Sequence, residues 1–127
     1  MVVHEERIGA TALLVPRGRI DSATAPALGE RLGGVLASPI SALVRDLSGL
    51  EYISSAGFRV LLVANRQAQS SGVPLHLCCL PDKVHQLFEL AGFLELFPIH
   101  AQMDEAVAAA SAGMAPGGRS AAGVPEA

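Results

Sequence analysis

Short aliphatic runs alternate with helical stripes along the chain, and this alternation constrains the fold more than any other feature of the sequence. Strands are predicted over Val2–Ile8, Ala12–Val15, Ala42–Leu47 and Val73–Cys79, with a short last strand over 94–99. Helices are predicted to follow Asp21, to run over 55–69, to run from Pro81-Asp82 to Gly92, and to cover 104–111. Such an alternation indicates an α/β fold, with a mixed β-sheet of four to five strands covered by about four helices.

Composition narrows the class of protein further. The 127 residues are 50% hydrophobic but only 4% aromatic, so the core must be aliphatic. The net charge is −3 and no Lys/Arg-rich run is present, which argues against a nucleic-acid partner. No apolar run approaches the ~20 residues of a membrane span. The first seven residues are polar and acidic, unlike a signal peptide. We therefore expect no membrane insertion and a cytoplasmic location.

The composition changes near residue 113. Residues 1–112 predict one domain of ordinary size. Residues 113–127 are mostly Gly, Ala, Pro and Ser with almost no bulky apolar side chain. A segment of this kind buries too little surface to offset the entropy of ordering, so a disordered tail is predicted there.

Metal and cofactor sites are not expected. Cys78 and Cys79 are neighbours in a predicted strand, where successive side chains point to opposite faces. That arrangement suits neither a structural disulfide nor a metal site. Arg17-Gly18-Arg19 lacks the further glycines of a dinucleotide-binding loop.

Ser54 and Ser55 stand between a predicted strand-and-turn segment and a predicted helix. Serine before a helix most often caps it, and this alternative stays open beside a nucleophile or a phosphorylation site. A nucleophile needs a nearby base. The four histidines (His4, His76, His85 and His100) lie in no catalytic motif, and the Gly-x-Ser-x-Gly elbow is absent. We therefore expect no catalytic residue and no enzyme activity.

Asp21 is a second polar candidate, because it follows a predicted strand at the carboxyl edge of the sheet. Asp21, Ser22 and Thr24 are all plausible N-caps for the next helix. Asp21 is therefore interpreted either as a helix cap or as a contact for a partner or a phosphate, since loops at this edge often carry function.

Three stretches resemble one protein family. Asp46 to Leu62, which contains Ser54-Ser55-Ala56-Gly57, resembles the signature of bacterial anti-sigma factor antagonists, the STAS domains. Gly18 to Asp21, followed by Leu28, resembles the first strand-to-helix turn of that family. The stretch 84–93 resembles its third helix and the turn after it. The resemblance spans about residues 3–110.

The resemblance implies a switch. Family members bind an anti-sigma factor that is also an ATP-dependent serine kinase, and binding frees a sigma factor. The kinase phosphorylates the serine two residues before the motif glycine, which releases the antagonist, and a serine phosphatase resets it. That serine corresponds to Ser55 here.

This sequence departs from the family pattern at three positions. Ser54 stands where many members have Asp, Ala56 where many have a second Ser or Thr, and Arg59 where several have Gly. Ser54 is therefore a backup acceptor. Arg59 lies four residues after Ser55, the spacing at which side chains on a helix can pair, so it is a candidate to contact a phosphate.

The predicted partner surface consists of polar and small residues from the two turns. It comprises Asp21, Ser22, Thr24, Ser54, Ser55, Ala56, Gly57 and Arg59. The alternative is a non-switching STAS docking subunit of a lipid-transport or stress-signalling complex, which would use the same surface without needing a chemically competent Ser55.

Overall fold

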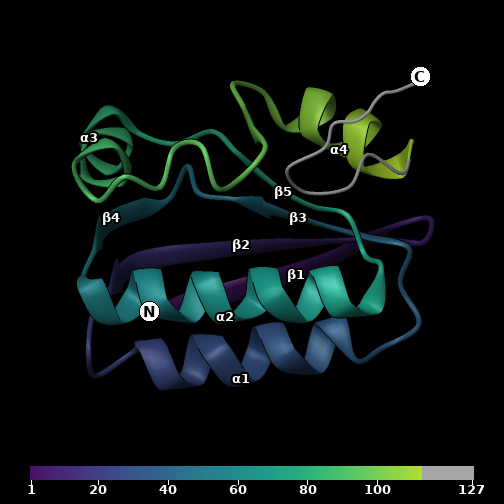
Figure 1. Ribbon diagram of the computed structural model, residues 1–127, viewed down its shortest axis with the longest axis horizontal. Helices are drawn as coiled ribbons and strands as arrows, with labels where there is room; N and C mark the ends of the chain where they lie inside the picture. Colours follow the sequence, from purple (N-terminus) through teal and green to yellow (C-terminus); the bar gives the residue numbers. More distant parts are fainter. Residues whose placement is uncertain (113–127) are drawn as a thin grey trace.

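The computed structural model describes residues 1–112 and contains a six-stranded sheet and four helices (Figure 1). The elements are β1 Val2–Ile8, β2 Thr11–Ile20, α1 Ala25–Leu36, β3 Ala42–Asp46, β4 Leu50–Ile53, α2 Ser55–Ser71, β5 Leu75–Cys78, α3 Asp82–Leu90, β6 Ile99–His100 and α4 Met103–Ser111. The main strand order is β1-β2-β3-β5-β6. β1 pairs with β2 antiparallel and the other pairs are parallel. The predicted mixed α/β architecture is confirmed.

Helices cover both faces of the sheet, because the central strands are apolar on both sides. In β2, Leu14 belongs to the larger core beneath α1, α2 and α3, whereas Leu13 belongs to a smaller core beneath α4. Figure 1 shows α1 and α2 side by side on one side of the strands and α4 on the other. Strands buried on both faces are typical of parallel sheets.

β2 is longer than its hydrophobic run suggested, and it pairs with two strands in succession. β3 lies beside residues 11–14 of β2, and β4 lies beside residues 18–20. The hydrophobic run predicts this strand only over Ala12–Val15, and the β4 segment resembles part of a turn, so the sequence predicts four to five strands and the structure has six. β4 has only four residues, and its extended conformation depends on the pairing with β2.

The last predicted strand is mostly wrong. Only Ile99 and His100 pair with β5, whereas residues 94–97 form a turn. Phe97 points into the larger core from this turn. Its burial produced the apolar pattern that resembled a strand.

Arg45 is an unusual member of the larger core. Its side chain is buried, its guanidinium carbon lies 5.5 Å from the centre of the Phe97 ring, and its three side-chain nitrogens have no hydrogen-bond partner among residues 1–112. Burial lowers the pKa of Arg45 to about 9.

Within residues 1–112, no helix has the length and apolar character that a membrane span requires. The disordered tail predicted for 113–127 lies outside the described residues.

Candidate functional site

Two turns meet at one edge of the sheet, where β2 and β4 end side by side. Ile20 and Ile53 are register partners at the ends of these parallel strands. The backbone N–H of Ser54 donates to the carbonyl oxygen of Ile20 at 2.8 Å. This bond places the turn that begins at Asp21 directly beside the serines that begin α2.

Gly57 allows α2 to begin this close to the strands. A Cβ atom at this position would lie 2.7 Å from side-chain carbons of both Ile20 and Ile53. Carbon atoms in proteins pack at about 3.5–4.0 Å, so any side chain here would push the helix away. The glycine of the motif therefore has a packing role beneath the surface, and Gly57 is buried.

Ser54 is the N-cap of α2. Its backbone is extended and its hydroxyl oxygen accepts a hydrogen bond from the N–H of Gly57 at 3.3 Å. This satisfies one of the first-turn amides that a helix leaves without an intrahelical acceptor. The capping role that remained open for the serine pair thus belongs to Ser54.

Ser55 is the first residue of α2 and is exposed. Among residues 1–112, its hydroxyl makes no hydrogen bond and its side chain has no charged partner. The free hydroxyl lies at the positive end of the helix dipole. Ala56 beside it is half-buried against the larger core, so it contributes less to the surface.

The polar groups of the Asp21 turn are engaged within the turn. Asp21 Oδ1 accepts hydrogen bonds from the backbone N–H groups of Ala23 at 3.0 Å and Thr24 at 3.2 Å. The Thr24 hydroxyl donates to the carbonyl oxygen of Arg19 at 2.9 Å. The backbone hydrogen bonds from Ala23 and Thr24 lower the pKa of the Asp21 carboxyl, with a smaller contribution from the charge of Arg19. Ser22 is exposed at the tip of the turn.

Arg59 is exposed one turn after Ser55 and makes no ion pair with any described residue. It borders a groove of about 250 Å³ between α1 and α2. The groove is lined by Gly29, Gly33, Arg59, Val60, Val63, Ala64 and Gln67. Arg59 therefore extends the surface of the two turns along α2.

The histidines do not form a catalytic arrangement with Ser55 in the described part of the chain. His76 Nδ1 lies 2.9 Å from His100 Nε2, and His4 Nε2 lies 3.1 Å from a carboxylate oxygen of Glu6. A serine nucleophile needs a base within hydrogen-bond reach. The structure gives Ser55 no such base among residues 1–112.

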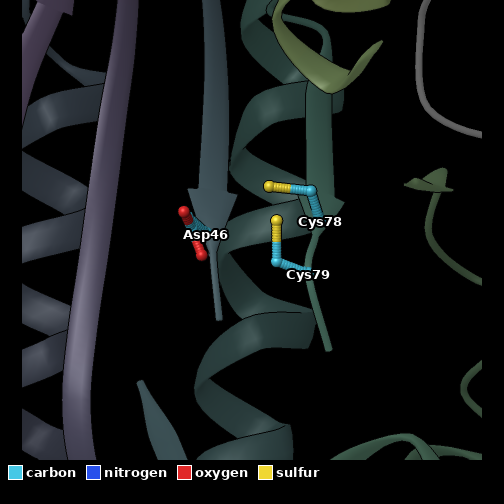
Figure 2. Close-up of side chains that lie close together, drawn as sticks. All are labelled: Asp46, Cys78 and Cys79. Carbon is cyan, nitrogen blue, oxygen red and sulfur yellow. The ribbon is translucent and has the colours of Figure 1, made fainter. Parts of the chain in front are cut away.

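The two cysteines lie on the same face of the sheet, contrary to the sequence analysis. Cys78 belongs to the smaller core and Cys79 packs against the same cluster. Cys79 follows the end of β5 with a φ of +64°, so the alternation of a regular strand no longer applies to it. Figure 2 shows both sulfur atoms beside the carboxylate of Asp46 at the end of β3.

This three-residue cluster was missed because adjacent cysteines in a strand-like sequence suggest opposite directions. The two sulfur atoms and a carboxylate oxygen of Asp46 lie within 4.8 Å of one another. Burial is the main cause that raises the pKa of both thiols. The only sequence signal for the cluster was Pro81 two residues after Cys79. Proline is disfavoured inside a sheet, so it indicates that the strand ends near the cysteines.

Comparison with known proteins gives a consistent result. The family model for the STAS domain matches residues 2–106. The chain is 37% identical over 110 residues to BtrV of Bordetella bronchiseptica, which is named as an anti-sigma factor antagonist, and the match covers 87% of this chain and 94% of BtrV.

Solved structures share the fold. An anti-sigma factor antagonist from Mycobacterium paratuberculosis superimposes with a TM-score of 0.75 at 27% identity, covering 87% of this chain and 93% of that one. The phosphorylated form of the Bacillus cell fate determinant SpoIIAA superimposes with a TM-score of 0.66 at 14% identity, covering 84% and 97%. At that identity the second likeness concerns the fold alone.

Proposed function

The chain belongs to the STAS domain family, and from this premise we propose that it is an anti-sigma factor antagonist that phosphorylation of Ser55 switches off. In its unmodified form it binds an anti-sigma factor and thereby releases a sigma factor. The 37% identity to BtrV over nearly the whole of both chains supports the antagonist role. The resemblance of the segment 46–62 to the family signature supports the switch.

One observation carries the choice of acceptor, namely the different use of the two serine hydroxyls. The hydroxyl of Ser54 accepts a hydrogen bond from Gly57, whereas the hydroxyl of Ser55 is exposed and makes no hydrogen bond in the described chain. A kinase can reach Ser55 without opening the helix cap. Ser54 is the less suitable acceptor, because its modification would remove a cap typically worth ~1 kcal/mol.

A phosphate on Ser55 is compatible with the fold. It would lie at the N-terminus of a 17-residue helix, where free N–H groups and the helix dipole favour an anion. The group adds almost two negative charges. SpoIIAA keeps a fold of this kind in its phosphorylated form. The switch can therefore act on an interface without unfolding the domain.

The same charge opposes a docked partner. A surface that seals over Ser55 would have to desolvate the phosphate, and a carboxylate facing it would be repelled. Each ~1.4 kcal/mol of such a cost weakens binding tenfold. Asp21 already places one carboxylate at this edge, so the surface becomes more strongly negative after modification.

The partners we propose are an anti-sigma factor with serine kinase activity and a serine phosphatase that acts on the modified form. The chain itself would be a cytoplasmic binding module and would need neither catalytic residues nor a cofactor. Its docking surface would consist of the Asp21 turn, the Ser54–Gly57 turn and Arg59.

The test combines phosphorylation with binding. The purified chain is incubated with ATP and each candidate anti-sigma kinase of its host, and intact mass is measured for wild type, Ser55→Ala and Ser54→Ala. We expect one phosphate on wild type and on Ser54→Ala, and none on Ser55→Ala. Calorimetry with the same kinase should then show at least ~10-fold weaker binding of the phosphorylated chain.

Two results would contradict the proposal. Phosphate retained in Ser55→Ala and lost in Ser54→Ala would move the acceptor by one residue. No phosphate and no binding with any candidate kinase, together with stable co-purification in a transport or stress-signalling complex, would favour the docking subunit. Circular dichroism of both variants shows whether a loss comes from misfolding.

A further inference from the structure

Three potential metal ligands converge between the ends of β3 and β5, outside the surface proposed to bind the anti-sigma factor. They are the carboxylate of Asp46 and the thiols of Cys78 and Cys79. Figure 2 shows the two side chains from β5 and the residue after it facing the one from β3. One ligand atom from each residue lies within 4.8 Å of the other two.

The three donors suit one kind of cation. Cysteine thiolates select soft or borderline metals, and zinc accepts sulfur and carboxylate oxygen together. Donors bound to one zinc at about 2.0–2.3 Å in a tetrahedral arrangement lie roughly 3.5–4 Å apart. In the structure no two of the three donor atoms are more than 4.8 Å apart, which is about 1 Å beyond that spacing. Calcium and magnesium are poor candidates, since both prefer oxygen ligands alone.

The surroundings also favour a cation. Two carboxylates, that of Asp46 and that of Asp104 at the start of α4, interact electrostatically with Cys79. Negative charges at this place attract a divalent cation, and a bound cation favours the thiolate form of its cysteine ligands. Asp46 and Cys79 are only half-buried, which leaves the cluster open to solvent on one side.

The Asp46 carboxylate is already oriented by a hydrogen bond from the backbone. The backbone N–H of Ser48 donates to Asp46 Oδ1 at 2.9 Å, in the turn between β3 and β4. Bonds of this kind hold a ligand in position and contribute to metal affinity. A metal ligated by Asp46 would therefore be connected, through this turn, to the strand that positions Ser54 and Ser55.

We propose that Asp46, Cys78 and Cys79 form a binding site for a thiophilic divalent cation of the zinc class, with three protein ligands and a fourth position open to water. Each thiol releases its proton to solvent as it coordinates, so two protons leave per metal bound. The site would join the ends of β3 and β5 and stabilise the folded chain. No redox step is involved.

The experiment uses the reduced full-length chain and zinc alone. Zinc affinity is measured by competition with a chromophoric chelator for wild type, Cys79→Ser, Asp46→Asn and the matched control Glu89→Gln, an exposed carboxylate on α3. Cobalt is then substituted, since a thiolate-to-cobalt charge-transfer band reports sulfur ligation directly. Cys79 and Asp46 are chosen because Cys78 is fully buried and its replacement could unfold the domain.

We expect one zinc per chain and an unchanged affinity in Glu89→Gln. Loss of a direct ligand should weaken binding by at least the 10–100-fold that is typical of an outer-shell partner. The thiolate band should fall in Cys79→Ser and persist, with weaker cobalt affinity, in Asp46→Asn.

The proposal is overturned if the reduced chain retains no zinc against the chelator, if cobalt shows no thiolate band, or if Cys79→Ser and Asp46→Asn both bind like wild type. Thermal melting without metal checks that each variant is folded. If Cys79→Ser does not fold, Asp46→Asn and the cobalt spectrum of wild type decide the question.

Discussion

The turn after β2 and the turn after β4 begin at the same edge of the sheet, but their polar side chains differ in whether they form hydrogen bonds within the turn. In the first turn, the Asp21 carboxylate and the Thr24 hydroxyl are both used by backbone groups of the turn itself. In the second turn, Ser54 is used in this way, whereas the hydroxyl of Ser55 makes no hydrogen bond with any of residues 1–112.

This comparison distinguishes polar groups that stabilise a turn from polar groups that are exposed to a partner. The first turn contains Asp21, Ser22 and Thr24 and the second contains Ser54 and Ser55, which are residue types that can cap helices and that can also be modified or recognised. Only the hydrogen bonds distinguish the two uses. The polar groups of the first turn are held by its own hydrogen bonds, and the second turn presents one exposed hydroxyl beside them.

The largest effect on this arrangement should come from Gly57. Gly57→Ala should destabilise the domain by about 1–3 kcal/mol, because the new methyl group would overlap Ile20 and Ile53 and separate the two turns. Urea denaturation measures the loss. Gly34→Ala in α1 is the matched control, since its Cβ would meet no atom within 4 Å. That variant should gain about 0.5–1 kcal/mol, and a loss of stability there instead would contradict the packing argument.

The two serines should differ in stability as they differ in hydrogen bonding. Ser54→Ala should lose about 0.5–2 kcal/mol of unfolding free energy, because it removes the cap bond to Gly57. Ser55→Ala should change stability by less than about 0.5 kcal/mol, as is usual for an exposed side chain without partners. Equal losses in the two variants, in the same denaturation assay, would remove the distinction between them.

The structural role of Asp21 should be visible in how the stability of the domain depends on pH. Its pKa is lowered in the folded state, so its charge stabilises the fold above the ordinary pKa of 3.8, and this contribution is lost as the pH falls through the lower folded value. Asp21→Asn keeps an oxygen acceptor but no charge. We expect a lower melting temperature than wild type at neutral pH, and a difference that shrinks in acid. A difference independent of pH would show that charge is not involved.

Arg59 should give the smallest effect. A helix pair at this spacing contributes about 0.2–0.5 kcal/mol, so Arg59→Gln should reduce by that amount any stabilisation gained when Ser55 is phosphorylated. The unmodified proteins should be equally stable. Melting of both variants before and after phosphorylation measures the difference. Arg66→Gln, further along the exposed side of α2, is the control.

Much of the architecture could be predicted, because the spacing of apolar residues along the sequence follows the buried face of each helix and strand. The start of α2 at Ser55 and the apolar stripe of α3 agree with the sequence analysis. β4 was missed, because four residues are too few to show the alternation of apolar and polar side chains that identifies a strand. The segment 94–97 was misread because Leu94, Leu96 and Phe97 form a short apolar run like that of a strand, although only Phe97 of the three is buried.

The family resemblance predicted the residues of the candidate site together with roles for them, with Ser55 as the acceptor, Ser54 as its backup and Arg59 as a phosphate contact. Local sequence patterns left Asp21 open as a helix cap or a partner contact, and the serine pair as a cap, a nucleophile or a phosphorylation site. That Ser54 caps α2 and that Asp21 is engaged in its own turn depend on which groups the folded backbone brings within hydrogen-bond distance.

The sequence by itself determined the alternation of strands and helices, the aliphatic core and the position of the serine turn, because these follow from local composition and periodicity. Only the tertiary structure decided which groups meet. It placed Ser54 beside Ile20. It also brought Cys79 close to Asp46, because Cys79 has a positive φ that the alternation of side chains along a strand does not predict. The physical reason is that contacts between distant segments depend on how strands pair and where each one ends, and these are properties of the assembled sheet.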